Sequence, residues 1–226
     1  MDFKAGEIFA IDKPYRISSF GALAHVRYVL SRTLGYKVKI GHAGTLDPLA
    51  TGVLILCTGK ATKRIEEFQG QTKEYTATLQ LGATTASYDM EHEVNASFPT
   101  EHITRELIND TLPQFIGDIE QIPPTYSAVK VNGDRAYELR RAGEEVKLKP
   151  KHIYIDEIEV VDFDVEKMQL SLRVVCGKGT YIRALARDLG RALNSGAYLT
   201  ALRRTRVGDF TIDRCLDYEH IREWIE

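Results

Sequence analysis

The stretch GHAGTLDPLATG, from Gly41 to Gly52, constrains the fold more than any other part of the chain. It sets a single carboxylate, Asp47, among glycines and one proline. Glycine adopts backbone angles closed to other residues and lets another backbone approach closely. Pro48 fixes its own φ and favours an extended conformation for Asp47. The pattern predicts a loop that holds one acid at a set angle, although a tight turn with a capping aspartate fits the same residues.

The hydrophobic patterns around this loop predict a mixture of strands and helices. The continuous apolar run VLILC (53–57) is typical of a buried strand, and KEYTATLQLG (73–82) alternates as a half-buried strand does. Apolar residues at helical spacing follow Ser18 or Ser19, either of which suits an N-cap, and Gly35 ends that helix. Further strands are expected at 7–14, 152–163, 168–176 and twice within 199–212, and helices at 61–68, 101–115, 134–143, 180–194 (capped by Thr180) and 217–226. Residues 83–100 are polar and acidic and are expected to form an exposed connection.

Without regular βαβ alternation, this order predicts an α+β fold with a mixed, largely antiparallel sheet and flanking helices. The length of 226 residues suits one sizeable domain or two small ones, and we expect a single domain over 1–226. With 43% hydrophobic and 27% charged residues, the composition is that of a globular protein. No apolar run reaches the length of a membrane span, and the amino terminus lacks a signal peptide. We therefore expect a cytoplasmic protein without a membrane partner.

Charge is unevenly distributed along the chain, although its net value is only −2. Residues 1–75 and 171–226 carry an excess of Lys and Arg, whereas 76–170 carry an excess of Asp and Glu. The two basic portions suit one positive face for a polyanion, and a solvated, uneven surface explains them equally well. The cysteines, Cys57, Cys176 and Cys215, are far apart and are expected to be reduced. No Cys or His spacing indicates a metal site.

A second glycine-flanked motif, CGKGTYIRALARDLG (176–190), places Tyr181 and Arg183 at the start of a helix. An arginine there opposes the helix dipole, so a carboxylate or anion partner would explain it better than solvent, which is nevertheless the commoner outcome. Phosphate-loop chemistry is excluded, because TGVLILCTGKAT (51–62) lacks the required first glycine and has Ala61 in place of Ser or Thr.

Together these stretches resemble the TruB family of tRNA pseudouridine synthases. The matching pieces are DKP (12–14), GHAGTLDPLATG, KEYTA (73–77), QIPPTYSAVK (121–130), GKGTYIRALA (177–186) and LRRT (202–205), in the order typical of the family and over almost the whole chain. The resemblance implies the pseudouridine synthase fold with a central RNA-binding cleft. It also implies isomerisation of uridine 55 in the T-loop of tRNA.

The resemblance carries specific roles to matching positions. It implies that Asp47 is the catalytic aspartate, Tyr75 the tyrosine that stacks on the target base, and Arg183 the arginine that pairs with the aspartate. A core position on a strand is the alternative for Tyr75. The expected substrate-binding residues are His42, which helps to hold the flipped nucleotide, Tyr181 and Leu202, which line the pocket, Lys13 and Pro14, which support the loop, and Gly44, Thr45 and Lys130.

The reaction moves the ribose C1′ from N1 to C5 of the same base, so nothing is oxidised and no group is added. We therefore expect no cofactor and no metal. One carboxylate suffices, as a nucleophile at the sugar or the base or as a base toward a sugar proton. The expected partner is the T-stem and loop of tRNA, reached by base flipping, with no obligate protein partner and a monomeric state. The alternatives are a guide-RNA-dependent relative resembling the dyskerin group and a non-catalytic RNA-binding or RNA-folding module.

Two departures from the family pattern bear on these expectations. The family usually has a glycine and a following serine after DKP, where this chain reads Tyr15 and Arg16, so the shape of the support loop is open. Many bacterial members continue into a PUA-type RNA-binding domain, and we expect none here. RNA contacts are then expected from a basic excursion at about 125–151 and from the stripe Arg187, Arg191, Arg203 and Arg204.

Overall fold

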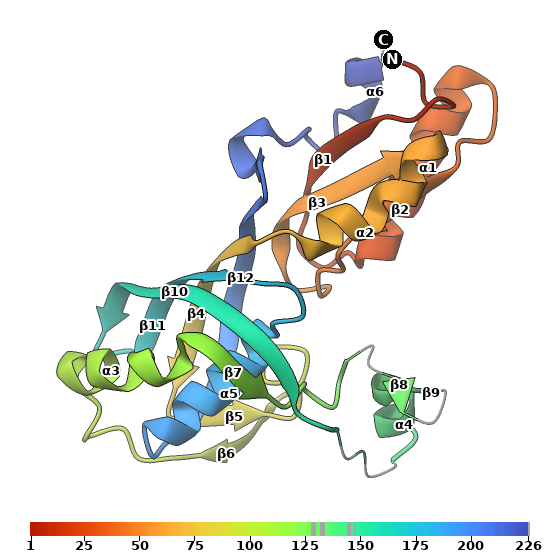
Figure 1. Ribbon diagram of the computed structural model, residues 1–226. Coiled ribbons are helices and arrows are strands. Elements are labelled where there is room, and N and C mark those ends of the chain that lie inside the picture. Colours follow the sequence, from red (N-terminus) through yellow and green to blue (C-terminus); the bar gives the residue numbers. More distant parts are fainter. Residues whose placement is uncertain (128–129, 132–133, 144–145, 147, 226) are drawn as a thin grey trace. The chain divides into compact units, whose positions relative to one another are not determined.

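The computed structural model describes residues 1–127, 130–131, 134–143, 146 and 148–225 (Figure 1). The chain forms two compact units. Unit 1 comprises Met1–Thr76 and Leu202–Glu226, and unit 2 comprises Ala77–Ala201. Unit 1 is therefore built from both ends of the chain and unit 2 from its middle. The expectation that residues 1–226 work as one domain stays a prediction.

Unit 1 is a small α/β layer structure. Its elements are β1 (Ile8–Lys13), α1 (Ser19–Leu34), β2 (Ile40–Ala43), β3 (Thr51–Thr58), a 3-10 helix (Gly59–Arg64), α2 (Ile65–Gly70), the second half of β12 (Ala197–Val207), β13 (Phe210–Thr211), a 3-10 helix (Ile212–Arg214) and α6 (Ile221–Ile225). Strands β1 and β2 pair antiparallel with β3, and β12 runs parallel to it. Strand β13 pairs antiparallel with β12.

Unit 2 is built on a longer run of strands. Its elements are β4 (Lys73–Leu81, beginning in unit 1), β5 (Ala83–Thr85), β6 (Val94–Ser97), α3 (Arg105–Thr111), a 3-10 helix (Leu112–Phe115), β7 (Gly117–Gln121), β8 (Lys130–Val131), β9 (Asp134–Arg135), α4 (Ala136–Arg141), β10 (Lys151–Asp164), β11 (Gln169–Cys176) and α5 (Ile182–Ala192). The strand order is β12-β4-β11-β10-β7. The pairs β10–β11 and β10–β7 are antiparallel. The expected α+β class with a mixed, largely antiparallel sheet is confirmed.

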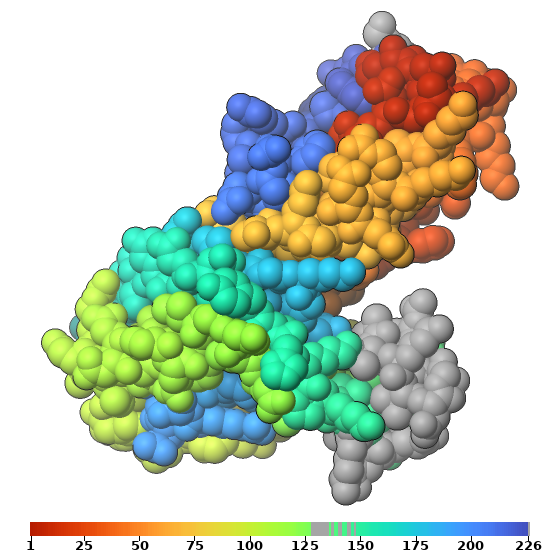
Figure 2. All heavy atoms as spheres, in the orientation of Figure 1, coloured from red at the N-terminus to blue at the C-terminus, as the bar shows by residue number. Residues whose placement is uncertain are grey.

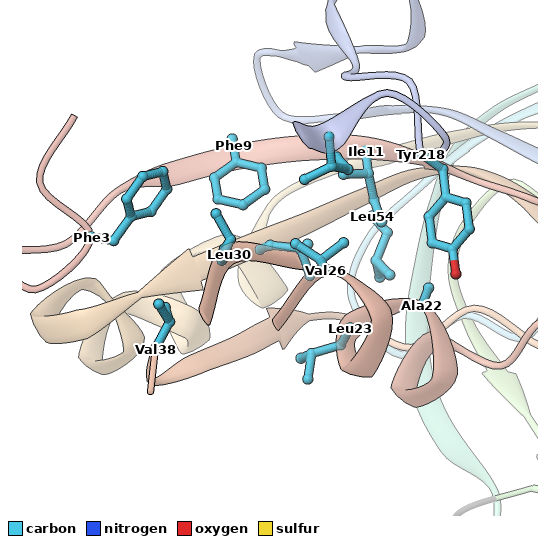
Figure 3. Close-up of a cluster of buried hydrophobic side chains, with 12 residues drawn as sticks. Phe3, Phe9, Ile11, Ala22, Leu23, Val26, Leu30, Val38, Leu54 and Tyr218 are labelled. Atoms are coloured by element: carbon cyan, nitrogen blue, oxygen red, sulfur yellow. The ribbon is translucent and has the colours of Figure 1, made fainter. Parts of the chain in front are cut away.

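Helix α1 covers the core of unit 1 (Figure 3). Ser18 is its N-cap, with a side chain that accepts a hydrogen bond from the Gly21 nitrogen. The apolar face, including Leu23, Val26 and Leu30, packs among buried side chains from β1 and β3. Gly35 ends the helix at φ 72°. Helical spacing in the sequence therefore predicted this element and its buried face correctly.

The two ends of the chain meet in unit 1 (Figures 1 and 2). The backbone nitrogen of Leu216 donates to the carbonyl of Ala10 at 2.8 Å, and the nitrogen of Asp12 donates to the carbonyl of Leu216 at 3.1 Å. Trp224 packs against Phe9 with ring centroids 4.8 Å apart and an angle of 46° between the planes. The carboxy-terminal segment thus closes the edge of the sheet formed by β1.

Three sequence expectations differ from the structure. The segment 83–100 is not merely an exposed connection, because β5 and β6 form a hairpin and the loop between them contains the buried Ser87 and Asp89. Thr180 does not cap α5; its hydroxyl donates to the carbonyl of Gly177, and Tyr181 is the N-cap residue without a side-chain hydrogen bond. The short strands β2 and β7 were not predicted, because runs of 4 and 5 residues carry too little pattern to indicate a strand.

None of the helices in the described part of the chain is both long and apolar enough for a membrane span. Among the same residues, no group of three or more His, Cys, Asp or Glu side chains is placed to bind a metal ion. The cysteines are free thiols. Burial raises the pKa of Cys57 to about 11 and that of Cys215 to about 12, so both stay protonated at neutral pH.

Gly52 shows why the opening motif ends in glycine. It is the second residue of β3, lies opposite Arg204 of β12 and adopts φ +107°. A Cβ atom there would lie 2.8 Å from the Arg204 nitrogen and would overlap the Arg204 carbonyl oxygen. The parallel pairing of β3 with β12 therefore requires a residue without a side chain.

We predict that Gly52→Ala destabilises the protein by about 2–5 kcal/mol, because backbone strain and a clash with fixed backbone act together. Gly35→Ala is the matched control, since Gly35 also has a positive φ but has no atom within 4 Å of an added Cβ. It should cost only about 1 kcal/mol. Urea unfolding of both variants measures the difference, and equal costs would show that the approach of the two strands is unimportant.

Candidate active site

The Asp47 loop, residues 44–50, connects β2 to β3. Gly44 enters it at φ +89°, and the nitrogen of Ala50 donates to the carbonyl of Asp47 at 3.0 Å, which closes a turn. Asp47 and Leu49 are half-buried, whereas Thr45 and Pro48 are exposed. The loop thus brings one carboxylate to the border between protein and solvent.

Ser19, the first residue of α1, fixes this loop from one side. Its hydroxyl accepts a hydrogen bond from the Leu46 nitrogen at 2.8 Å and donates to the Leu46 carbonyl at 3.0 Å. Leu46 itself is buried. The residue that precedes Asp47 is therefore held through its backbone and its side chain together.

Lys13 also binds the Asp47 loop, through its ammonium group. It is the last residue of β1 and is fully buried. Its ammonium group donates to the carbonyls of Pro14 (2.9 Å), Ile17 (2.6 Å) and Pro48 (3.4 Å). The pKa of Lys13 is lowered from 10.5 to about 8, mainly because burial disfavours the charged form. The charge of Asp47 opposes this shift, and the charge of Arg204 adds to it. Lys13 therefore ties the loop after β1 to the Asp47 loop.

Arg204 of β12 binds the loop at both ends. Its guanidinium donates from Nη2 to the carbonyl of Gly44 at 3.0 Å and from Nε to the carbonyl of Val53 at 2.8 Å. The side chain is 1% exposed. His42, in β2, has a buried Nδ1 without a hydrogen-bond partner among the described residues. Burial, and then the charge of Arg204, lowers the pKa of His42, which keeps the imidazole neutral.

The support loop after Lys13 keeps the conformation of a glycine without having one. Arg16 adopts φ 65°, which is the left-handed region that glycine favours. Its guanidinium lies 5.5 Å from the centre of the Tyr15 ring. Despite the departure from the family pattern, the backbone at Arg16 therefore has a conformation that glycine would adopt easily. Because Arg16 carries a side chain, this conformation costs about 1–2 kcal/mol.

Three further predicted residues lie on strands or at a helix start. Tyr75 occupies an inward position of β4 and is 7% exposed, which suits either a stacking or a core role. Leu202, in β12, is half-buried. Tyr181 is anchored through its backbone in unit 2: its nitrogen donates to Gln121 Oε1 at 2.9 Å, and its carbonyl accepts from Gln121 Nε2 at 3.2 Å.

Arg183 lies buried in the first turn of α5. Its Nη1 donates to the carbonyl of Ser87 at 3.2 Å, and its Nε lies 3.7 Å from Asp89 Oδ2. Within unit 2 its carboxylate partner is Asp89, and the pairing with Asp47 that the resemblance implies stays a prediction. The sequence analysis missed Asp89, because it lies in an acidic segment that is typical of exposed connections.

The expected basic stripe is wrong at two of its four positions. Arg187 is buried, donates to the carbonyl of Ile122 at 2.8 Å and pairs with Asp188, and Arg204 is buried as described. Arg203 pairs with Asp12 at 2.7 Å. Lys130, predicted to bind substrate, has a side chain outside the described part of the structure, as does Lys147 of the excursion.

A different basic surface exists in unit 1. A hollow of about 300 Å³ is lined by Phe3, Lys4, Tyr36, Lys37, Val38, Lys39, Gly59, Lys60 and Lys63. All of its lysines are exposed. Lys4 lies over the Tyr36 ring, 4.3 Å from its centre. We call this surface the lysine hollow.

Two family models together match the chain from residue 31 to residue 226. Residues 31–182 match the TruB family pseudouridylate synthase N-terminal domain, and residues 183–226 match the tRNA pseudouridylate synthase B C-terminal domain. The chain belongs to the TruB family.

Relatives in this family are similar to this chain over its full length. The chain is 62% identical to tRNA pseudouridine synthase B of Bacteroides thetaiotaomicron, covering 100% of this chain and 95% of that protein. The corresponding protein of Flavobacterium johnsoniae is 49% identical over 100% of this chain and 98% of its own length. Among solved structures, a Cbf5-Nop10-Gar1 complex contains a chain that is 28% identical with a TM-score of 0.72. The match covers 99% of this chain and 56% of that one, so this TruB chain spans little more than half of it.

The two units thus divide the predicted site. Unit 1 gathers Lys13, Pro14, His42, Gly44, Thr45 and Asp47 around one loop, and it also contains Tyr75 and Leu202. Unit 2 holds Tyr181 and Arg183 on the entry to α5. The contacts of Ser19 and Arg204 with the Asp47 loop were not predicted, because hydrogen bonds to backbone carbonyls leave no pattern in the sequence.

We predict that Lys13 makes stability rise with pH between about 8 and 10.5. In that range the unfolded lysine keeps its proton and the folded lysine has lost it, so stability increases by up to about 1.4 kcal/mol per pH unit. Urea unfolding at several pH values should show this rise in the wild type relative to Lys13→Met. Replacing the exposed Lys60 by Met is the control and should run parallel to the wild type. Parallel curves for all three proteins would contradict the lowered pKa.

Proposed function

We propose that this chain converts uridine to pseudouridine in tRNA, at position 55 of the T-loop, with Asp47 as its catalytic carboxylate. The observation that carries this proposal is the construction of the Asp47 loop, in which Ser19, Lys13 and Arg204 hold the backbone on both sides of one half-buried acid. The full-length similarity to proteins named tRNA pseudouridine synthase B supports the same reaction.

The chemistry needs little beyond a positioned carboxylate. The bond between C1′ and N1 breaks, a bond between C1′ and C5 forms, and the hydrogen on C5 leaves as a proton. Asp47 attacks the sugar or the base, or removes a sugar proton, and these routes stay open. A loop with fixed backbone ends lowers the entropy cost of bringing the carboxylate to the everted nucleotide.

The remaining roles are proposals that the family resemblance supports. We assign base stacking to Tyr75, a charge role in the reaction to Arg183 and a contact with the flipped nucleotide to His42. The other proposed substrate-binding residues are Lys13, Pro14, Gly44, Thr45, Lys130, Tyr181 and Leu202. We further propose that residues 1–226 act as one catalytic domain, that the protein works as a monomer without an obligate protein partner, and that it acts in the cytoplasm.

A guide-RNA-dependent enzyme is the second candidate, because the matched solved structure is a complex of Cbf5 with Nop10 and Gar1. The higher identity to tRNA pseudouridine synthase B over the full chain favours the first. The two candidates differ in one requirement that is easily measured. Only the first should act on tRNA with no guide RNA and no added protein.

The test is tritium release from tRNA transcripts labelled at C5 of uridine. The purified wild type should release tritium without any guide RNA, and a transcript with cytidine at position 55 should release none. Asp47→Asn should reduce the single-turnover rate by more than about 1,000-fold, because an amide neither attacks nor accepts the proton. Its melting temperature and tRNA affinity should stay close to those of the wild type. Appreciable release by the Asn variant would remove Asp47 from its proposed role.

The lysine hollow is our proposed second contact with the tRNA backbone. It borders Gly59, just after the end of β3, whereas the Asp47 loop precedes the start of that strand. The strand has 8 residues, so it separates the two places by roughly 25 Å at about 3.3 Å per residue. Exposed ammonium groups clustered in a hollow suit phosphates as point charges.

We predict that the triple variant Lys37→Gln, Lys39→Gln and Lys60→Gln weakens tRNA binding without lowering the single-turnover rate at saturation. The slope of log affinity against log salt should become shallower by about one unit for each phosphate that the variant no longer neutralises. Lys167→Gln is the control, since Lys167 already pairs with Asp164 at 2.9 Å and should leave the slope unchanged. An unchanged slope in the triple variant would exclude the hollow from RNA binding.

A further inference from the structure

Arg183 is held by a network that extends beyond its partner Asp89. Asp89 is 6% exposed, and its Oδ1 accepts hydrogen bonds from the Glu91 nitrogen at 2.9 Å and from the Ser87 hydroxyl. Its backbone carbonyl accepts from the Thr85 hydroxyl at 2.6 Å. Ser87 thus contacts the arginine directly through its own carbonyl and holds the carboxylate of Asp89, which pairs with the same arginine. A shift of Ser87 would move both groups that orient the guanidinium.

The hydrogen-bonding capacity of Ser87 fixes the direction of the network. An ionised carboxylate only accepts, so the single hydroxyl hydrogen of Ser87 points to Asp89. His92 Nδ1 lies 3.0 Å from the same hydroxyl oxygen, which can then only accept from it. His92 therefore carries a hydrogen on Nδ1 and donates it to Ser87. The hydrogen bonds therefore run from His92 to Ser87 and from Ser87 to Asp89, and Asp89 pairs with Arg183.

The ring of His92 also contacts a residue from a distant part of the chain. It packs against Tyr126 with ring centroids 4.5 Å apart and an angle of 47° between the planes. Tyr126 belongs to QIPPTYSAVK, at the start of the segment 125–151 that the sequence marks as basic. His92 is half-buried, whereas Ser87 is fully buried. It is therefore the link between this segment and the buried groups around Arg183.

We propose that His92 is a positioning residue that orients Arg183 through Ser87 and Asp89. The inference rests on the proposed function, in which Arg183 takes part in the reaction. The hydrogen bond from His92 keeps the Ser87 hydroxyl directed at Asp89, which holds the carboxylate that faces the guanidinium of Arg183. Because Ser87 and Asp89 are buried in a medium of low dielectric, their directions act strongly on the guanidinium.

Two substitutions of His92 separate the hydrogen bond from the ring contact. His92→Asn keeps a donor close to the position of Nδ1 and loses the ring, whereas His92→Phe keeps the ring and loses the donor. If the donor positions Arg183, Phe should lower the single-turnover rate about tenfold at unchanged tRNA affinity, which is about 1.4 kcal/mol of transition-state stabilisation. Asn should recover most of that loss. Equal activity of Phe and wild type, with Asn impaired, would overturn the proposal in favour of simple packing.

A double-mutant cycle tests the route of the effect. In a Ser87→Ala background the relay is already broken, so His92→Phe should have no further effect on the rate. Additive losses would show that His92 acts by another path. Melting temperatures of all variants identify any that fold poorly, and Asn and Phe are then compared only among folded proteins.

A readout independent of turnover separates this inference from the proposed function. In protein with ¹⁵N-labelled arginine, the Nε–Hε signal of Arg183, assigned by its loss in Arg183→Lys, should shift in His92→Phe and return in His92→Asn. An unmoved signal in His92→Phe would overturn the relay even if the enzyme makes pseudouridine. If the wild type releases no tritium but the His92 variants show the expected signal shifts, the proposed function is wrong and the relay still holds.

Discussion

The burial of Arg204 is the constraint on which the Asp47 loop depends. One guanidinium reaches the carbonyl of Gly44 before the loop and the carbonyl of Val53 after it, and the backbone of the same residue pairs with Gly52. Moving a positive charge out of water is costly unless hydrogen bonds replace the lost solvent. The carbonyls of Gly44 and Val53 supply those bonds, so a displaced loop would leave the buried charge without one of its hydrogen-bond partners.

The same arrangement recurs around each buried cation described above. Lys13 is surrounded by three backbone carbonyls, and Arg183 by a carbonyl and the carboxylate of Asp89. Backbone carbonyls belong to the fold and cannot rotate away as a side chain can. Groups near the proposed chemistry are therefore fixed before any RNA arrives, which is the condition for electrostatic catalysis without reorganisation.

Much of the fold could be predicted from local patterns. The alternation in 73–82 gave β4 with Tyr75, Ala77, Leu79 and Leu81 all buried, and helical spacing gave α1 with its caps. The Asp47 loop was predicted as a loop, and Gly44 and Gly52 at its two ends have the positive φ values that only glycine adopts easily.

Other features could not be predicted, and the reasons are physical. Arg187 and Arg204 look like surface residues in the sequence, because the backbone carbonyls that bind them belong to every residue and leave no pattern. Ser87 and Asp89 lie in an acidic stretch whose burial depends on contacts with α5, far away in the sequence. Arg16 adopts a left-handed conformation that no propensity favours, because the chain on either side is already fixed by Lys13 and by the cap of α1.

Unit 1 is assembled from the first and last parts of the chain, and this order matters during synthesis. Gly44 and its partner Arg204 are 160 residues apart. At roughly 5–20 residues per second, a ribosome needs roughly 10–30 s between making the two. Unit 2 is continuous and is complete earlier. The Asp47 loop therefore gains the contact of Gly44 with Arg204 only after the whole of unit 2 has been synthesised.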